Sequence, residues 1–580
     1  MAPDSRPSRL RAFADAADRR LGHRALIAAA ADHPVPGGAR FAYVFGSALL
    51  FAFGLQALTG IALATGYSPS VTDAWASVHH IQHHLTLGWL VRGIHHFGSS
   101  AMVVLCVLHM TQVFFFGAWR APREANWWLG VVMLLLVLAF GLTGYLLPWD
   151  QKGYWATQVA MSITGGAPGG EQLQALLQGG PQAGNLTLTR FYAIHVLLLP
   201  ATLGALTLGH VSLFRRHGVT ASPKADPATL QSRAEPFWPY QWLRDAVFAL
   251  IVLGILIALS VWVGASLEAP ADPAGAYEAR PEWYFLFLFQ LLRIFEGPLL
   301  IVGTVVIPGL AILFLLAVPL LDRRTGGLPA PRVAVPFVLL IGGAMALTVY
   351  ALATDRADVD FLDGRAAADR DALQAHRLAE AGGIDASGRV VLLAGLQLFH
   401  QKGCVSCHAR EVEADVHAPL LAGYGTEARL DRFLRAPDAR ELFGLTPLRE
   451  EMEPFGGPDA DRAALVAWLT SLSGREPSNP ERTARGRALF DGSGCTDCHN
   501  DPDLRAGAAD WELDAAGPDL RGFQGYEWVR GLLRDAGHPS WFGGVVGPDD
   551  EGVMPAFPDL SDDELDLLVR WLLAGAPGAD

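Results

Sequence analysis

Cysteine is scarce in this chain, with five residues among 580. Four of the five occur as two closely spaced pairs, Cys404 with Cys407 and Cys495 with Cys498. The fifth, Cys106, lies in an apolar run and is expected to be a small core residue. With four cysteines assigned to the two pairs, only Cys106 remains, and one cysteine cannot form a structural disulfide by itself. The fold must therefore be stable without one.

No cleavable signal sequence is expected at the start of the chain, and the second half of the chain is not basic. Residues 1–34 are rich in arginine and contain no cleavable apolar region before the first long apolar run. Residues 355–580 carry 41 acidic and 22 basic residues, and the whole chain has a net charge of −14. This acidic segment would repel nucleic acid and suits a basic protein partner, so no nucleic-acid partner is expected.

Apolar residues, by contrast, are abundant. They make up 51% of the chain, and the mean hydropathy is +0.26, as is typical of membrane proteins. Seven runs are long enough to cross a bilayer, which takes about 20 residues. They lie near residues 41–64, 92–116, 127–147, 190–214, 243–264, 299–320 and 333–353.

Arginine is concentrated in the N-terminal arm and in the loops after the second, fourth and sixth runs. Because basic loops stay in the cytoplasm, the N-terminus is predicted to be cytoplasmic. Seven crossings then put residues 355–580 on the opposite side, in the periplasm of a bacterial inner membrane.

Both cysteine pairs belong to the motif CxxCH, completed by His408 and His499. This motif attaches c-type haem: the two thiols bind the porphyrin covalently and the histidine binds the iron. A zinc site or a redox dithiol is the alternative, and the directly following histidine disfavours both. Haem c is attached outside the cytoplasm, which agrees with the predicted topology.

Two apolar runs carry paired histidines, His95 with His109 and His195 with His210, at spacings of 14 and 15 residues. At about 100° and 1.5 Å per residue, each pair lies on roughly one helix face, about 21–22 Å apart. Histidine inside a membrane is costly and usually functional. Two stacked bis-histidine haems are therefore predicted, with His95 and His195 at the outer level and His109 and His210 at the inner. His96 is the alternative to His95, at a less favourable angle.

Three segments resemble cytochrome b of the bc and bf complexes: GWLVRGIHHF, LTGYLLPWDQKGYWA and TLTRFYAIH. The resemblance covers residues 35–353 and is greater to the seven-span chloroplast-type protein, here with both halves fused, than to the eight-span mitochondrial form. Four glycines, in pairs 14 residues apart, match the family pattern and would let a porphyrin contact the helix backbone: Gly46, Gly60, Gly130 and Gly144. The cysteine that holds an extra haem in the chloroplast-type protein is replaced by Val44, so no third membrane haem is expected.

The segment Arg280-Pro281-Glu282-Trp283-Tyr284 resembles the PEWY motif of that family's quinol-oxidation site. The resemblance implies that Glu282 accepts a proton from quinol and that Tyr284 and Tyr145 line the pocket. A carboxylate near bulk water suits this role, because quinol oxidation releases protons.

Two arginines, Arg92 and Arg190, closely precede the outer histidines and are candidates to pair with haem propionates. The alternative is ordinary snorkelling of arginine at helix ends. The histidine-rich run at 79–84 lacks an evident carboxylate or cysteine partner, and we expect a solvated or interfacial helix there rather than a metal site.

Two repeats follow a linker at residues 355–386. Each repeat has glycine and phenylalanine before its haem motif and a tryptophan in its last amphipathic helix, and so resembles class I cytochrome c, in which the first and last helices cross. Met452 is the expected sixth ligand in the first repeat and Met554 in the second. His417 is the alternative to Met452.

The expected fold is all-α: a seven-span transmembrane bundle followed by two small helical cytochrome c domains. The domains are expected at 1–34 (cytoplasmic arm), 35–220 (four-helix haem bundle), 221–354 (three-helix part with the PEWY loop), 355–386 (linker), 387–475 and 480–578 (cytochrome c domains).

The resemblance implies a cytochrome b fused to a dihaem cytochrome c in a proton-translocating quinol:cytochrome c oxidoreductase, with two b haems and two c haems. The implied partners are a separate Rieske iron–sulfur protein, membrane quinone, an electron acceptor such as cytochrome c, and a second copy of the complex. A non-catalytic membrane-anchored electron conduit and an assembly subunit with relic haems are the alternatives.

Overall fold

A computed structural model describes residues 9–180, 182–221, 223, 226–273, 277–324, 326–382, 391–408, 418–443, 452–474, 479–499, 517–538, 541 and 554–577. The chain divides into two compact units. The first comprises residues 1–271 and 277–368, and the second residues 369–580 with 272–276. Each unit is described by itself.

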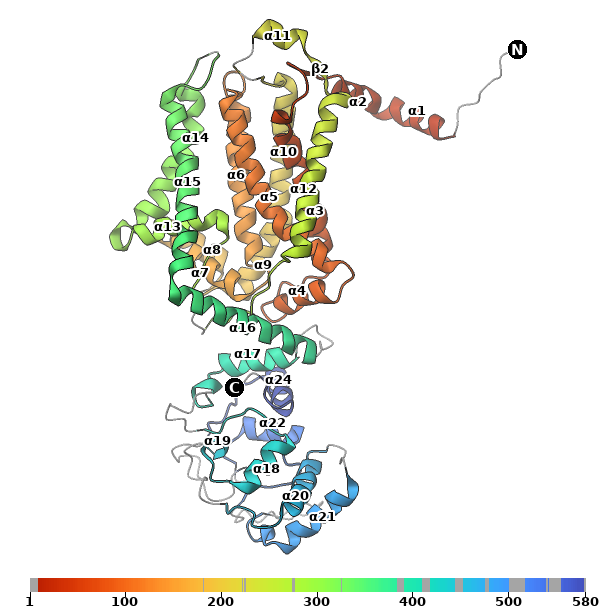
Figure 1. The fold of residues 1–580 in the computed structure, drawn as a ribbon, viewed down its shortest axis with the longest axis vertical. Helices are drawn as coiled ribbons and strands as arrows, with labels where there is room; N and C mark the ends of the chain where they lie inside the picture. Colours follow the sequence, from red (N-terminus) through yellow and green to blue (C-terminus); the bar gives the residue numbers. More distant parts are fainter. Residues whose placement is uncertain are drawn as a thin grey trace, which may run out of the picture. The chain divides into compact units, whose positions relative to one another are not determined.

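Among its described residues, the first unit contains seven helices long and apolar enough to cross a membrane, as the sequence predicted (Figure 1). The spans are formed by η1 (Phe41–Tyr43) with α3 (Val44–Ala64), α5 (Gly88–Phe115), α6 (Glu124–Tyr145), α9 (Asn185–Ala193) with η2 (Ile194–Leu198) and α10 (Leu199–His217), η3 (Phe237–Gln241) with α12 (Trp242–Trp262), η6 (Val302–Val306) with α14 (Ile307–Leu321), and α15 (Pro331–Ala357).

Shorter elements lie before, between and after the spans. They are α1 (Arg9–Leu21), α2 (His23–Ala31), α4 (Ala74–His83), α7 (Gln151–Gly166), α8 (Gly170–Gln178), α11 (Pro227–Ser232), η4 (Trp283–Phe285), α13 (Leu286–Ile294), η5 (Gly297–Leu299) and α16 (Val359–Gly382), whose second part belongs to the second unit. The short strands β1 (Pro34–Val35) and β2 (Glu235–Pro236) pair antiparallel.

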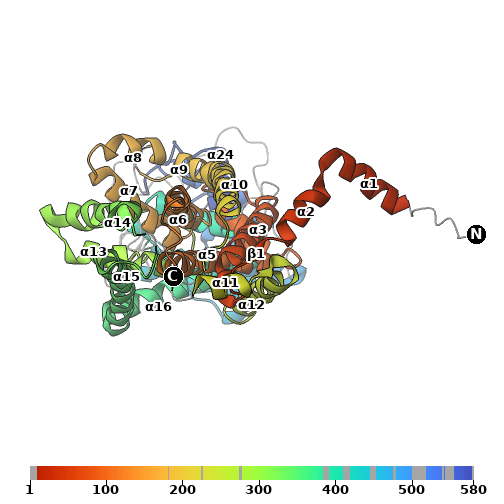
Figure 2. The same ribbon diagram turned by 90° about the horizontal axis from the view of Figure 1, so that it is seen from above.

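The centre of the first unit is an apolar cluster between α3, α5, α6 and α10. It includes Ala52, Met102, Val137 and Leu203, one from each helix. Each of these residues lies about midway between the two histidine or glycine levels of its helix. The cluster therefore separates the two levels. Seen from above, α13, α14 and α15 lie together on one side of α6 (Figure 2).

The fourth span is not a regular α-helix, because η2 is a π-helical segment and contains His195. A π segment accommodates one extra residue in a helix. Pro200 follows directly and lacks the N–H that would extend the α-helical ladder back to Val196. The 15-residue spacing from His195 to His210 thus covers nearly the same rise and rotation as the 14-residue spacing on α5. On a regular α-helix, 15 residues would leave an angular offset of about 60°, and the π segment reduces this offset.

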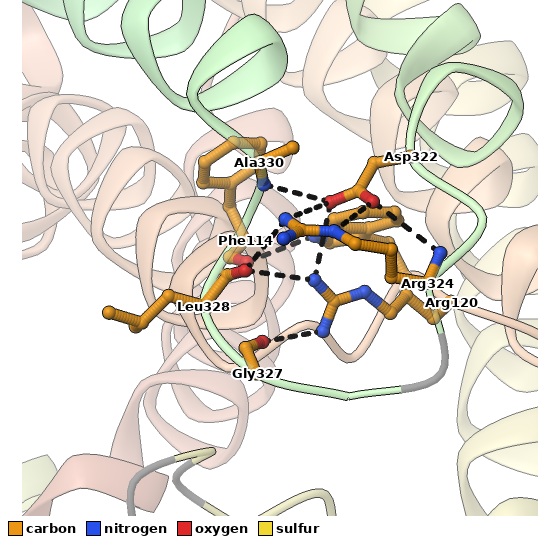
Figure 3. Close-up of polar contacts among 8 residues, drawn as sticks. Phe114, Arg120, Asp322, Arg324, Gly327, Leu328 and Ala330 are labelled. Atoms are coloured by element: carbon orange, nitrogen blue, oxygen red, sulfur yellow. Dashed lines mark hydrogen bonds and ion pairs between the residues drawn. The ribbon is translucent and has the colours of Figure 1, made fainter.

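At the end of the first unit nearer His109, a buried carboxylate joins two loops (Figure 3). Asp322 is 0% exposed and accepts hydrogen bonds from Arg324 Nε at 2.8 Å, the Ala330 amide at 2.9 Å and Arg120 Nη2 at 3.3 Å. The Arg324 guanidinium holds the pKa of Asp322 well below its usual range. These contacts connect the loop after α5 to the loop after α14, so they join regions 35–220 and 221–354.

The second unit consists of short helices around two apolar clusters. Beyond the end of α16, its described helices are α17 (Val391–Gln401), η7 (Cys404–Ser406), α18 (Glu427–Arg435), α19 (Arg440–Phe443), α20 (Asp459–Leu472), α21 (Pro480–Gly492), η9 (Cys495–Asp497), α22 (Tyr526–Arg534) and α24 (Asp562–Leu573).

The first and last helices of the two repeats pair across the repeats rather than within them. Helix α17 of the first repeat packs against α24 of the second, and α20 of the first packs against α21 of the second. The expectation that the end helices of each repeat cross each other is therefore wrong. Only the short segment 473–479 joins α20 to α21, and helices joined by a short connection usually pack together.

Candidate haem and quinol sites

The outer histidine level is assembled from four helices. The imidazole rings of His95 and His195 face each other with centroids 6.4 Å apart. A Cβ atom on Gly60 would lie 3.1 Å from the His95 ring, and one on Gly144 would lie 2.6 Å from the His195 ring. The two glycines therefore leave room beside the two histidines that a larger residue would fill.

The inner level repeats this arrangement. The rings of His109 and His210 have centroids 6.3 Å apart, with Gly46 beside His109 and Gly130 beside His210. Imidazole nitrogens bind metal ions at about 2 Å, which puts the centroids of two rings on one ion roughly 6 Å apart. Both histidine pairs fit the axial ligation of a haem iron.

Two threonines orient the outer histidines, and sequence reasoning missed both. Thr59 Oγ1 donates to the Leu55 carbonyl at 2.8 Å and lies 2.9 Å from His95 Nδ1. Thr143 Oγ1 donates to the Ala139 carbonyl at 2.8 Å and lies 3.0 Å from His195 Nδ1. Because each hydroxyl proton is already used, each threonine accepts the Nδ1 proton and leaves Nε2 free for a metal. The sequence feature that could have identified these threonines is the Thr-Gly dipeptide, which occurs at both 59–60 and 143–144.

The alternative ligand His96 does not face His195. Its ring contacts the Phe97 ring edge-on, with centroids 4.9 Å apart. Arg92 donates to the carbonyls of Ala265 and Ser266 at 2.7 and 2.6 Å. Arg190 donates to the carbonyl of Leu176. Pairing of either arginine with a propionate stays a prediction.

The histidine-rich run at 79–84 is less exposed than expected. His79 is buried, with its ring stacked 5.2 Å from the Trp75 ring. His83 and His84 are exposed, so one face of this helix is buried and the other is open. Val44 is also buried, at the start of α3.

The PEWY segment lies against the end of α6 and the start of α7. Lys152 Nζ donates to Glu282 Oε1 at 2.7 Å, and both side chains are about four-fifths buried, with exposures of 23% and 18%. The ammonium group also lies 5.5 Å from the centroid of the Tyr145 ring. The sequence alone assigns this lysine no role. Lys152 and Glu282 are 130 positions apart, and no sequence pattern predicts that they are in contact.

Both tyrosines of the predicted site lie beside this ion pair. Tyr145 Oη donates to the Arg280 carbonyl at 3.1 Å. Tyr284 is 6% exposed, belongs to the apolar cluster between the histidine levels and contacts Gly141 of α6, where a Cβ would lie 3.0 Å from its hydroxyl oxygen. The structure therefore brings Glu282, Tyr145 and Tyr284 together.

Buried acidic groups fix the neighbouring loop. Asp150 caps α7 by accepting from the Gly153 amide at 2.8 Å, and it also accepts from the Glu268 amide at 3.3 Å. Burial raises the pKa of Asp150, and hydrogen bonding from Gly153 and the charge of Lys152 oppose that rise. Burial likewise raises the pKa of Glu268, whose carboxylate accepts from Tyr277 Oη at 2.7 Å. This loop is held in place around the ion pair.

The segment leading into the PEWY motif is anchored from behind. Arg280 Nε donates to both carboxylate oxygens of Asp355 at 3.2 Å, and its guanidinium stacks on the rings of Phe289 and Phe361. The Nε–H is shared between the two oxygens, and the two ring contacts fix the plane of the guanidinium. The position of Glu282 is therefore set from both sides.

The two CxxCH motifs have similar surroundings. Each begins after a glycine with positive φ, Gly403 at 75° and Gly494 at 75°. His408 Nδ1 lies 2.7 Å from the Pro419 carbonyl, and His499 Nδ1 lies 3.2 Å from the Pro518 carbonyl. Donation from Nδ1 leaves Nε2 free, as an axial haem ligand requires. Free cysteine thiols and correctly oriented histidines fit covalent haem at both motifs.

The two methionines lie opposite to the expected assignment. Met452 packs in the cluster that contains Cys495, and Met554 packs in the cluster that contains Cys404. The expected placement of each methionine beside the haem motif of its own repeat is wrong, because the helices pair across the repeats. The alternative ligand His417 lies outside the described residues.

Comparisons with known proteins match both units. A family profile described as Cytochrome b(N-terminal)/b6/petB matches residues 100–270, and one described as Cytochrome b(C-terminal)/b6/petD matches residues 270–361. The Cytochrome c profile matches residues 392–473.

Two curated relatives and one solved structure match part of the chain. The chain is 37% identical over 315 residues to the cytochrome bc complex cytochrome b subunit of Chlorobaculum thiosulfatiphilum, covering 53% of this chain and 73% of that protein. It is 41% identical over 215 residues to the menaquinol:cytochrome c reductase cytochrome b subunit of Bacillus subtilis, covering 36% and 96%. A chain of a hyperthermophilic respiratory Complex III matches with a TM-score of 0.51 and 28% identity, covering 58% and 91%.

Proposed function

The chain belongs to the cytochrome b family of bc-type complexes, and from this we propose that it oxidises membrane quinol at Glu282 as the fused cytochrome b and cytochrome c subunit of a quinol:cytochrome c oxidoreductase. The observation that carries this proposal is the buried Lys152–Glu282 pair beside Tyr145 and Tyr284. A conduit that only passed electrons would need no proton acceptor in this position.

Four haems would be held by this chain. His95 with His195 and His109 with His210 would bind two b haems, and the two CxxCH motifs would bind two c haems. Each haem, when bound, takes up and passes on one electron. The threonine hydrogen bonds would make His95 and His195 more basic ligands for the haem at the outer level.

Glu282 would take one of the two protons that quinol releases. In this arrangement its Oε1 accepts a hydrogen bond from Lys152, and this oxygen is the acceptor that a quinol proton would reach. Lys152 holds the carboxylate in position, and the exposed fraction of both side chains leaves a path to water. Arg280 and Asp355 hold the loop, and Tyr284 forms its apolar side. This is general base catalysis at a fixed position.

The second electron would leave through a separate Rieske iron–sulfur protein, because the five cysteines provide no ligand set for such a cluster. From there it would reach the c haems and a cytochrome c-like acceptor. Quinone would be reduced near the inner level, and proton release outside coupled to uptake inside would translocate protons. We further propose a homodimeric complex in a bacterial inner membrane.

The haem content tests the cofactor proposal. Two histidine pairs and two CxxCH motifs predict equal amounts of b and c haem, because Val44 cannot attach a further membrane haem covalently. A pyridine haemochrome assay on the purified complex should therefore give a b:c ratio of one. A ratio of two to three would mean that a third covalent haem is present.

The topology has its own test. Basic loops after the even-numbered spans predict that the acidic second unit lies in the periplasm. Protease added to intact spheroplasts should release a haem-staining fragment, whereas lysed cells provide the control for complete digestion. Protection of this fragment in intact spheroplasts would contradict the proposed orientation.

A further inference from the structure

The second unit contains two apolar cores, and each core is built from both repeats. The first core joins Phe399 of α17 to Val529 of α22 and to Trp571 of α24. The second core joins Phe490 of α21 to Leu434 of α18 and to Trp468 of α20. We call the first set of helices with the Cys404–His408 motif the first composite domain, and the second set with the Cys495–His499 motif the second composite domain.

The tightest helix contacts lie within the composite domains. A Cβ on Gly395 of α17 would lie 2.3 Å from Trp571 Cβ, and one on Gly486 of α21 would lie 2.7 Å from Trp468 Cβ. The helix pairs therefore meet at glycine, where any side chain would force them apart. The glycine of each repeat contacts the tryptophan of the other.

Polar contacts reinforce the first composite domain. Lys402, just after α17, pairs with Glu564 of α24 at 2.8 Å. The Gly423 amide donates to the Gly575 carbonyl at 2.8 Å. These bonds join segments more than 150 residues apart in the sequence, from opposite repeats.

The two methionine loops have equivalent supports. The amide of Phe455, three residues after Met452, donates to the Leu434 carbonyl of α18 at 2.8 Å. The amide of Phe557, three residues after Met554, donates to the Leu533 carbonyl of α22 at 3.3 Å. Each methionine loop is therefore bonded to a helix of its own repeat, α18 or α22. Loop and helix lie together in the composite domain that contains the haem motif of the other repeat. Met554 packs with Cys404, and Met452 with Cys495.

Each repeat passes from one composite domain to the other through a short segment that contains glycine. Residues 423–426 precede α18, and residues 522–525 precede α22. Gly423, Gly425 and Gly522 have φ values of 73°, 73° and 65°, which only glycine adopts readily. Exchange of equal segments at such hinges is domain swapping, here between two repeats of one chain.

We propose that the two cytochrome c repeats are interleaved, so that each c haem is bound by both. Met554 would be the sixth ligand of the haem attached at Cys404 and Cys407, and Met452 that of the haem attached at Cys495 and Cys498. This inference rests on the two covalent haems of the proposed function. Neither repeat alone could hold a methionine-ligated haem.

Single-haem variants test the crossed ligation. Replacing Cys495 and Cys498 with alanine in the full chain leaves only the first c haem. In that background, Met554→His should abolish the long-wavelength thioether–iron absorption of the oxidised haem and lower its midpoint potential, because histidine replaces a ligand that raises it. Met452→His, the matched control, should change neither property. The mirror background, lacking Cys404 and Cys407, should give the reverse result.

The outcomes are distinct. If Met452→His changes the absorption and potential of the first haem, or if neither variant does, the interleaved arrangement is overturned while the proposed function stands. Absence of haem from either CxxCH motif of the unmodified chain would instead count against the proposed function.

A second experiment needs no ligand variant. A protease recognition sequence replacing residues 475–478 would allow cleavage between α20 and α21 in membranes. Interleaved repeats should keep the fragment that carries the second haem motif bound to the membrane after cleavage. Release of this fragment into the soluble fraction would overturn the interleaving.

Discussion

Replacing Glu282 with glutamine should lower quinol oxidation at least about tenfold, because a well-placed general base typically contributes about 10²–10⁴-fold. The partly exposed pair with Lys152 leaves water able to substitute in part, so the loss should be smaller than the upper end of that range. Glutamine keeps the size of the side chain and leaves Arg280 and Asp355 in place. Turnover measured with quinol in membranes, normalised to b haem, is the test.

Glu296→Gln is the matched control for this variant. It makes the same substitution on an exposed glutamate in the same half of the bundle. Both variants should retain both b-haem spectra, because neither residue contacts the paired histidines. Unchanged turnover in Glu282→Gln with full haem content would refute the assigned role and favour a non-catalytic electron conduit.

Replacing His95 with leucine should remove the outer b haem altogether. His195 would lose its opposite ligand across a 6.4 Å ring separation, and the space beside Gly60 and Gly144 would lose its occupant. We therefore expect half of the b haem and less accumulated protein, because an empty apolar cavity destabilises a packed bundle. Dithionite-reduced difference spectra of the membranes measure the haem loss.

His96→Leu provides the comparison that identifies the ligand. The two histidines are adjacent in the sequence, yet only the His95 ring faces His195. His96→Leu should keep both b haems. Loss of the outer haem in His96→Leu, with retention in His95→Leu, would reverse the assignment of the outer ligand.

The membrane part of the fold could be predicted closely because its signals are local and repeated. Length and hydropathy determine each span, and period 3.6 places paired residues on one face of a helix. The predicted partners His95 with His195 and His109 with His210 lie together for this reason. The π segment at His195 was not predicted, since its cause is a single proline, Pro200, whose effect depends on the surrounding packing.

Contacts between distant segments were harder to predict. The pairing of Lys152 with Glu282 depends on how two loops meet, which no spacing in the sequence encodes. The interleaved repeats are a stronger case. Each repeat carries the same glycine, tryptophan and methionine positions, so crossed and uncrossed pairings use the same kinds of contact. Sequence patterns identify the parts of such a domain, and only the three-dimensional structure identifies their partners.

Quinol oxidation that divides its two electrons between the b and c haems is the central claim, and a single-turnover experiment tests it most directly. The oxidised complex with its iron–sulfur partner would be mixed with quinol while an inhibitor blocks reoxidation at the inner level. Reduction of b haem should then equal the combined reduction of the iron–sulfur partner and the c haems, and both should slow in Glu282→Gln. Reduction of the c haems without any reduction of b haem would contradict the account.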